Sequence, residues 1–182
     1  FVEIKVALFA AMMIAFPVIA NQLWKFVAPG LYRKEKRALL PFLLATPVLF
    51  ATGACFAYFL TIPIALKFLL GYQGDIGGIT QEALPSVGNY LSFTMQFIMA
   101  FGIAFLLPIL LMLIERSGLV TREQLVSARR YMIVAAFAIA AVFTPPDILS
   151  QLLLAVPLVF LYEMSLFAIW FTQRRRKTGA EI

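Results

Sequence analysis

Glu35 is a single acid inside a strongly basic segment that lies between two long apolar stretches. Its neighbours Arg33, Lys34, Lys36 and Arg37 would by themselves hold a loop on the cytoplasmic side of a membrane, because that role needs only Lys and Arg. The acid therefore has one of two roles. It is an ordinary surface charge in solvent, or it exists to meet a cation.

Polar groups within the apolar stretches are the second set with chemical potential, because such groups are costly in hydrocarbon. Glu163 lies near the middle of the last apolar stretch, where we expect it to be protonated, paired or facing water. It marks a groove or proton-sensitive site, or it is an inward-facing acid hydrogen-bonded to a neighbouring helix. Gln96, Asn21 and Gln22 are further polar groups inside the spans.

A Pro-Pro-Asp turn separates the last two apolar stretches, with Thr144 before it and Gln151 shortly after it. These two side chains cap the helix ends at the membrane surface, or they offer a docking point, because Thr and Gln hydrogen-bond across helix interfaces. Asp147, directly after the prolines, is expected to be the N-cap of the next helix.

Catalytic and metal-binding constellations are absent from the sequence. There is no histidine, which removes the commonest general base and metal ligand, and the two Asp residues lie in loops. There is also no glycine-rich phosphate loop followed by Lys. We expect no enzyme, no cofactor and no metal site. The net charge of +6 is interpreted as a topology signal and not as a nucleic-acid footprint.

Composition identifies the chain as an all-α membrane protein, because 63% of its 182 residues are hydrophobic and 13% are charged. No strand-like alternation interrupts the apolar stretches, which favours helices over a barrel. We predict one transmembrane domain over residues 1–182, with spans at about 4–28, 39–70, 87–114, 131–144 and 149–171 and a tail at 172–182. At ~1.5 Å per residue the second span is about 48 Å long and the fourth only about 21 Å.

Prolines recur within these spans, and each removes a backbone donor and bends its helix. Together they favour a curved, concave bundle over a tight parallel one. They are Pro17, Pro41, Pro47, Pro63, Pro108 and Pro157.

Thirteen of the fifteen Lys and Arg residues fall in three clusters that five spans place on one side of the membrane, which is then the cytoplasm, and Lys5 and Lys67 lie toward the other side. The C-terminal tail would be cytoplasmic and residue 1 outside. Because no signal peptide precedes Phe1, we expect at least one further span upstream. The run Arg174–Lys177 anchors the tail or binds anionic lipid. The clusters are Lys25 with Arg33, Lys34, Lys36 and Arg37; Arg116, Arg122, Arg129 and Arg130; and Arg174–Lys177.

Four stretches, taken in order, resemble TatC, the large multispanning subunit of the twin-arginine protein translocase. They are PVIANQLWKF (17–26), APGLYRKEKR (28–37), YLSF (90–93) and FTPPDILSQ (143–151). The resemblance covers essentially the whole chain, from the family's second span to its tail. It implies a six-span protein of the bacterial cytoplasmic (inner) membrane with both termini in the cytoplasm.

The resemblance implies a receptor that binds twin-arginine signal peptides of folded proteins and organises their export, driven by the proton-motive force. Glu35 matches the family's glutamate at the twin-arginine site, with Leu31, Tyr32 and Arg37 beside it. A carboxylate accepts a guanidinium fork in two parallel hydrogen bonds. The family's second acidic contact precedes its first span and is outside this sequence. Implied partners are the single-span TatA and TatB, other TatC copies and membrane lipids.

Other family positions carry over onto single residues. Thr144 and Gln151 match a polar cluster offered to TatA and TatB, and Glu163 matches an acid of the last span. One position departs: Leu106 stands where the family usually has Glu or Gln, and Gln96, about three turns away, is not an obvious substitute. The resemblance assigns the concave inner face to Pro17, Gln22, Phe26 and Tyr58.

A secondary transporter or channel subunit is the alternative function. Such proteins place several ionisable groups near the membrane midplane, often with repeat symmetry. The sequence has one midplane acid, Glu163, and no evident internal repeat. We therefore expect a receptor and translocase core.

Overall fold

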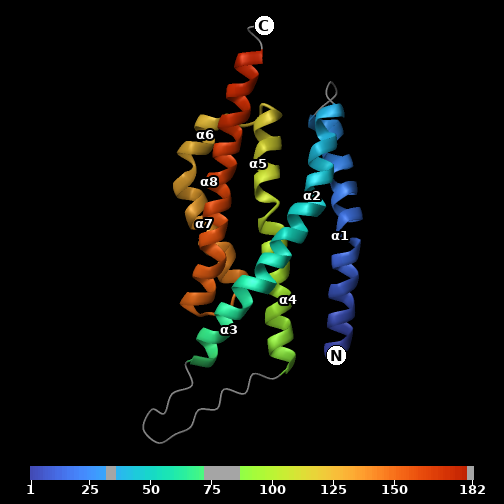
Figure 1. Cartoon of the computed structure of the whole chain (residues 1–182), viewed down its shortest axis with the longest axis vertical. Coiled ribbons are helices and arrows are strands. Elements are labelled where there is room, and N and C mark those ends of the chain that lie inside the picture. The colour runs from blue at the N-terminus through green and yellow to red at the C-terminus, as the bar shows by residue number, and fades with distance from the viewer. Residues whose placement is uncertain (32–35, 72–86, 180–182) are drawn as a thin grey trace, which may run out of the picture.

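The structure is a computed structural model that describes residues 1–31, 36–71 and 87–179, except for the side chains of residues 27–40, 69 and 176–179. Every regular element in these ranges is helical (Figure 1), which confirms the predicted all-α fold. In chain order they are α1 (Val2–Leu31), α2 (Lys36–Phe56), the π-helix η1 (Ala57–Thr61), α3 (Ile62–Gly71), α4 (Val87–Ala104), α5 (Leu107–Arg116), α6 (Arg122–Ser127), α7 (Arg129–Phe143) and α8 (Ile148–Gly179).

Four helical segments of the described chain are long and apolar enough to cross a membrane: Val2–Phe26, Pro41–Phe68, Val87–Arg116 and Ile148–Arg175. They correspond to the first, second, third and fifth predicted spans. The predicted fourth span is α7, whose 15 residues fall short of the ~20 that a bilayer needs. A tight turn joins α7 to α8, and the two helices pack against each other (Figure 1).

Two of the predicted proline bends interrupt a span. Before Pro63 the helix widens into η1, where the Ile62 N–H donates to the carbonyl of Ala57, five residues back. Before Pro108 the third span breaks between α4 and α5, and the Leu106 N–H donates to Ile103, three residues back. Helix α8, in contrast, continues through Pro157. These bends, together with the diagonal course of α2 and α3 across the bundle (Figure 1), make the wall curved.

Helices α2 and α4 cross at two glycines. A Cβ on Gly53 would lie 2.4 Å from the carbonyl oxygen of Phe101, and one on Gly102 would lie 2.5 Å from the ring of Phe50. Small residues allow membrane helices to approach this closely. The ring of Phe16 stacks on that of Phe50, with centroids 3.5 Å apart, and brings α1 against α2.

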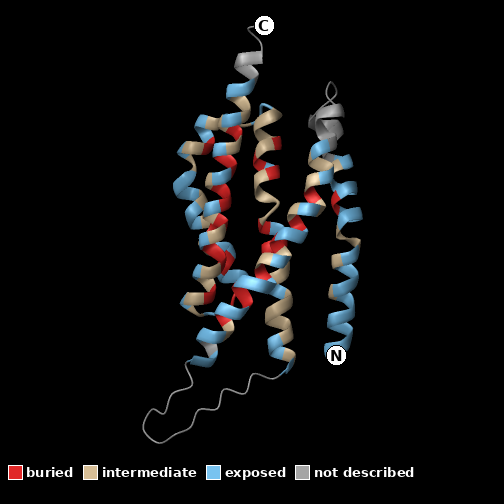
Figure 2. Ribbon diagram, viewed as in Figure 1, coloured by how far each residue is buried: buried red, intermediate tan, exposed pale blue. Residues whose placement is uncertain are grey.

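The buried core lies among η1, α3, α4, α5, α6, α7 and α8, whereas α1 is exposed along most of its length (Figure 2). One cluster occupies the middle of the bundle and includes Phe97, Phe101, Ala136, Ala140, Leu154 and Leu158. A second cluster lies nearer the end where α5 meets α6 and comprises Leu111, Leu125, Tyr162, Leu166 and Ile169.

Candidate functional site

The segment that contains Glu35 joins the end of α1 to the start of α2. Glu35 and Tyr32 lie outside the described residues, as do the side chains of Leu31 and Arg37. The flanking helix ends share one end of the bundle with the end of α5 and the C-terminal part of α8 (Figure 1). The segments with the three basic clusters therefore meet at one end, as the charge pattern predicts. Assigning that end to the cytoplasm stays a prediction.

A partly open cavity of about 530 Å³ lies between α1, α2 and the bundle of α4, α5, α7 and α8. Its wall is almost entirely apolar. The principal polar groups in it satisfy each other, because the Trp24 Nε1–H donates to Thr46 Oγ1 at 2.9 Å and Thr46 donates to the carbonyl of Phe42 at 2.7 Å. The cavity can accept an apolar chain or helix face without leaving a polar group unpaired.

The side chains of α1 that line this cavity are Phe16, Ala20, Leu23 and Trp24. Sequence reasoning missed them, although their spacing places them on one helix face. The four residues expected on the concave face, Pro17, Gln22, Phe26 and Tyr58, are exposed and do not line the cavity, and Tyr58 packs edge-on against Phe59. Their role at a wider inner face stays a prediction.

Leu106 lies in the cavity wall, half-buried, beside Leu107. The departure from the family's usual Glu or Gln therefore leaves an apolar side chain in the cavity. Gln96 is exposed on α4 and is not part of this wall. No acidic side chain lines the cavity among the residues that the structure describes.

The Thr144–Gln151 turn is held by internal hydrogen bonds. Thr144 is only 8% exposed, and its hydroxyl donates to the carbonyl of Ala140 at 2.7 Å. Asp147 Oδ2 accepts from the Ser150 N–H at 2.7 Å, which is the N-cap contact expected from the sequence. Gln151 Nε2 donates to the carbonyl of Phe137 at 3.2 Å and so ties α8 to α7. A docking role for Thr144 and Gln151 stays a prediction.

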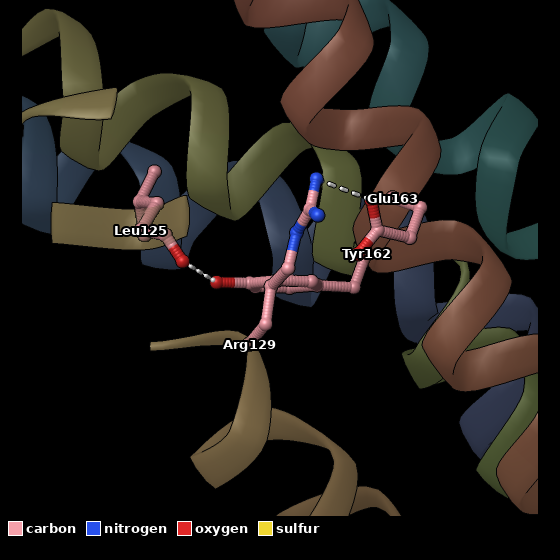
Figure 3. Close-up of polar contacts among 4 residues, drawn as sticks. All are labelled: Leu125, Arg129, Tyr162 and Glu163. Atoms are coloured by element: carbon pink, nitrogen blue, oxygen red, sulfur yellow. Dashed lines mark hydrogen bonds and ion pairs between the residues drawn. The ribbon is translucent and has the colours of Figure 1, made fainter. Parts of the chain in front are cut away.

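Glu163 is paired, which is one of the three states expected for it. Arg129 Nη2 at the start of α7 lies 2.9 Å from Glu163 Oε2, and the two side chains are 49% and 43% exposed (Figure 3). The adjacent Tyr162 hydroxyl donates to the carbonyl of Leu125 at 2.5 Å. Together these contacts fasten the α6–α7 corner to α8. The charged partners are 34 positions apart in the sequence, so no local pattern predicted the pairing.

A sequence model of the Sec-independent protein translocase protein TatC matches residues 1–157 of the chain. The chain belongs to the TatC family. TatC of Magnetococcus marinus is 47% identical over 176 residues, which cover 97% of this chain and 64% of that protein. TatC of Aquifex aeolicus is also 47% identical, over 180 residues that cover 97% of this chain and 72% of that protein. The chain thus spans less than two thirds of the M. marinus TatC.

Solved TatC structures share this fold. A crystal structure of the twin-arginine translocase receptor TatC in the detergent DDM matches with a TM-score of 0.82 and 48% identity, over 92% of this chain and 73% of that one. A second TatC receptor structure gives a TM-score of 0.81 at 45% identity, over 95% of this chain and 75% of that one. The curved arrangement of helices is therefore the TatC fold.

The polar groups that the TatC fold brings together here are few. Among the described residues, no group of three or more His, Cys, Asp or Glu side chains could hold a metal ion. The one ion pair in this part of the chain joins Arg129 and Glu163.

Proposed function

We propose that this chain is the receptor core of a twin-arginine translocase of the bacterial inner membrane, which binds twin-arginine signal peptides and organises the export of folded proteins driven by the proton-motive force. The observation that carries the proposal is the match to a solved twin-arginine translocase receptor, at 48% identity over 92% of this chain. A match over most of the chain supports carrying the receptor role over, with binding residues sought in the loops, where such residues concentrate.

Glu35, with Leu31, Tyr32 and Arg37, is the proposed contact for the paired arginines. Two observations support it. Glu35 is an acid among four basic neighbours, so a guanidinium has a single carboxylate in that segment to pair with. The helix ends on either side lie at the same end of the bundle as the other basic segments (Figure 1), which is the end expected to face the cytoplasm.

Binding of a twin-arginine signal peptide tests this proposal. In membranes, a photoreactive signal peptide should crosslink to the wild-type chain, and Glu35→Ala should reduce the yield at least tenfold, because an unpaired guanidinium loses a charge-assisted hydrogen bond. Glu35→Asp should retain part of the yield.

Glu123→Ala is the matched control, because Glu123 is an exposed acid on α6 at the same end of the bundle. It should leave the yield unchanged. Normal crosslinking to a folded, membrane-inserted Glu35→Ala protein would contradict the receptor assignment.

Thr144 and Gln151 are proposed to contribute to docking of the single-span partners TatA and TatB. Gln151 is only partly buried, and its amide oxygen remains available while its Nε2 binds Phe137. The short helix α7 beside it exposes Val142 and Phe143 at the same end. A polar group next to exposed apolar side chains is the kind of surface that associates with a membrane helix.

A further inference from the structure

The cavity described above has the size and lining of a site for an apolar chain. Its volume of about 530 Å³ lies within the ~300–1,000 Å³ typical of small-ligand sites. The wall is formed by Leu106, Leu110, Met132 and Leu158 among others, with no acid among the described lining residues. An acyl chain would enter without desolvating a charge, whereas a carboxylate at position 106 would impose that cost.

A cation lies beyond one end of this cavity. Arg116 ends α5, and its guanidinium carbon is 5.0 Å from the ring centroid of Phe42 on α2. Phe42 is one helical turn from Thr46, and Arg116 is less than two turns from Leu110, and both Thr46 and Leu110 belong to the wall. The guanidinium therefore spans from α5 to α2 near the end of the apolar space.

The charge of Arg116 is not neutralised within the described part of the chain. Its buried Nε has no hydrogen-bond partner there. The adjacent acid, Glu115, instead accepts a hydrogen bond from Gln173 Nε2 at 2.7 Å. A guanidinium held on an aromatic ring is well arranged to meet a phosphate, since its planar set of donors matches phosphate oxygens.

We propose that this cavity binds one anionic phospholipid. An acyl chain lies in the cavity against Leu106, and the headgroup phosphate binds the guanidinium of Arg116. The proposal goes beyond signal-peptide recognition, which involves the segment around Glu35. Charge complementarity selects the lipid as occupant, because an apolar space that ends at an unneutralised cation matches an anionic amphiphile.

Lipid retention tests the proposal on the purified protein in mild detergent. Phosphatidylglycerol and phosphatidylcholine with identical chains are added, and bound lipid is counted by native mass spectrometry. The wild type should retain one phosphatidylglycerol with about fivefold preference, as expected for one basic residue near an anionic headgroup. Arg116→Gln should abolish the preference, and Leu106→Glu should reduce retention of both lipids.

Arg175→Gln is the matched control, because Arg175 stacks on Phe171 of α8, which does not line the cavity. It should keep the wild-type preference. Equal retention of the two lipids by the wild type, or an equal effect of Arg175→Gln and Arg116→Gln, would overturn the proposal.

A second measurement uses the wild-type protein, so its outcome does not depend on whether a variant folds. Photoactivatable phosphatidylglycerol should label the wild-type peptide that contains Leu106–Leu110. Labelling of that peptide by a twin-arginine signal peptide or another membrane helix, with none by the lipid, would assign the cavity to a helix and overturn the proposal.

Discussion

At the scale of single residues, the ion pair of Arg129 and Glu163 shows how this chain tolerates an acid in an apolar stretch. The two side chains are about half exposed and 2.9 Å apart. Pairs with this exposure contribute little, typically about 0.2–1 kcal/mol, so the value of this one lies mainly in positioning the α6–α7 corner. The buried hydroxyl of Tyr162 bonded to Leu125 holds the same corner through a neutral contact.

A charge swap tests the pair. Arg129→Glu and Glu163→Arg should each lower stability, because each places two like charges side by side. The double variant should recover about 0.5–1 kcal/mol relative to the sum of the single effects. The measurement is unfolding in a detergent titration followed by circular dichroism. Additive effects of the two single variants would show that Arg129 and Glu163 are not coupled. The control variant is Arg130→Glu, which changes the neighbouring arginine that stacks on Tyr131.

At the scale of elements, the glycine contacts of α2 and α4 set the crossing that shapes the cavity. The carbonyl oxygen near Gly53 is backbone and cannot rotate away, whereas the Phe50 ring near Gly102 is a side chain. The crossing brings Thr46 of α2 and Ala100 and Ala104 of α4 to the same cavity. The position of the cavity thus depends on where α2 and α4 can approach each other closely.

Replacing Gly53 by alanine should therefore destabilise the protein. Alanine stabilises a helix by about 0.5–1 kcal/mol relative to glycine. A net loss of stability must therefore come from the clash of the new Cβ with the Phe101 carbonyl oxygen, and overpacking of this kind costs about 1–3 kcal/mol. Gly71→Ala is the control, because a Cβ there meets nothing within 4 Å, and it should be neutral or slightly stabilising. Equal unfolding midpoints for the two variants in the same detergent titration would refute the close crossing.

At the scale of the whole molecule, the bundle places chemically distinct segments at its two ends. The end of α1, the start of α2, the end of α5 and the C-terminal part of α8 share one end, while the start of α1, the end of α3 and the start of α4 share the other (Figure 1). Basic residues are concentrated in the segments of the first end. The charge distribution and the helix directions therefore predict the same topology.

Reporter fusions test this topology. A reporter after Ile182 and one inserted after Lys36 should both be active in the cytoplasm, whereas one inserted at Gly78 should be active outside. The reason is that an odd number of crossings separates Gly78 from each of the other two positions. A reporter at residue 182 found outside would overturn the arrangement of five spans, including the short α7.

Much of the architecture could be predicted from the sequence. The helical class, the four long apolar helices and the short fourth segment follow from the lengths of apolar runs, because a bilayer forces each span to satisfy its own backbone. The bends before Pro63 and Pro108 follow from proline chemistry. The N-cap role of Asp147 follows from its place after two prolines, and the need of Glu163 for a partner follows from the cost of a bare charge in hydrocarbon.

Other features were decided only by the tertiary structure. The partner of Glu163, the position of Leu106 in a cavity wall and the stacking of Arg116 on Phe42 all depend on how each helix is rotated about its axis. The sequence of a helix that is apolar on every side does not reveal which side is buried. Neither the rotation of such a helix about its axis nor the angle at which two helices cross can therefore be inferred from hydropathy. Those are settled by close contacts such as Gly53 against Phe101, which join residues far apart in the chain.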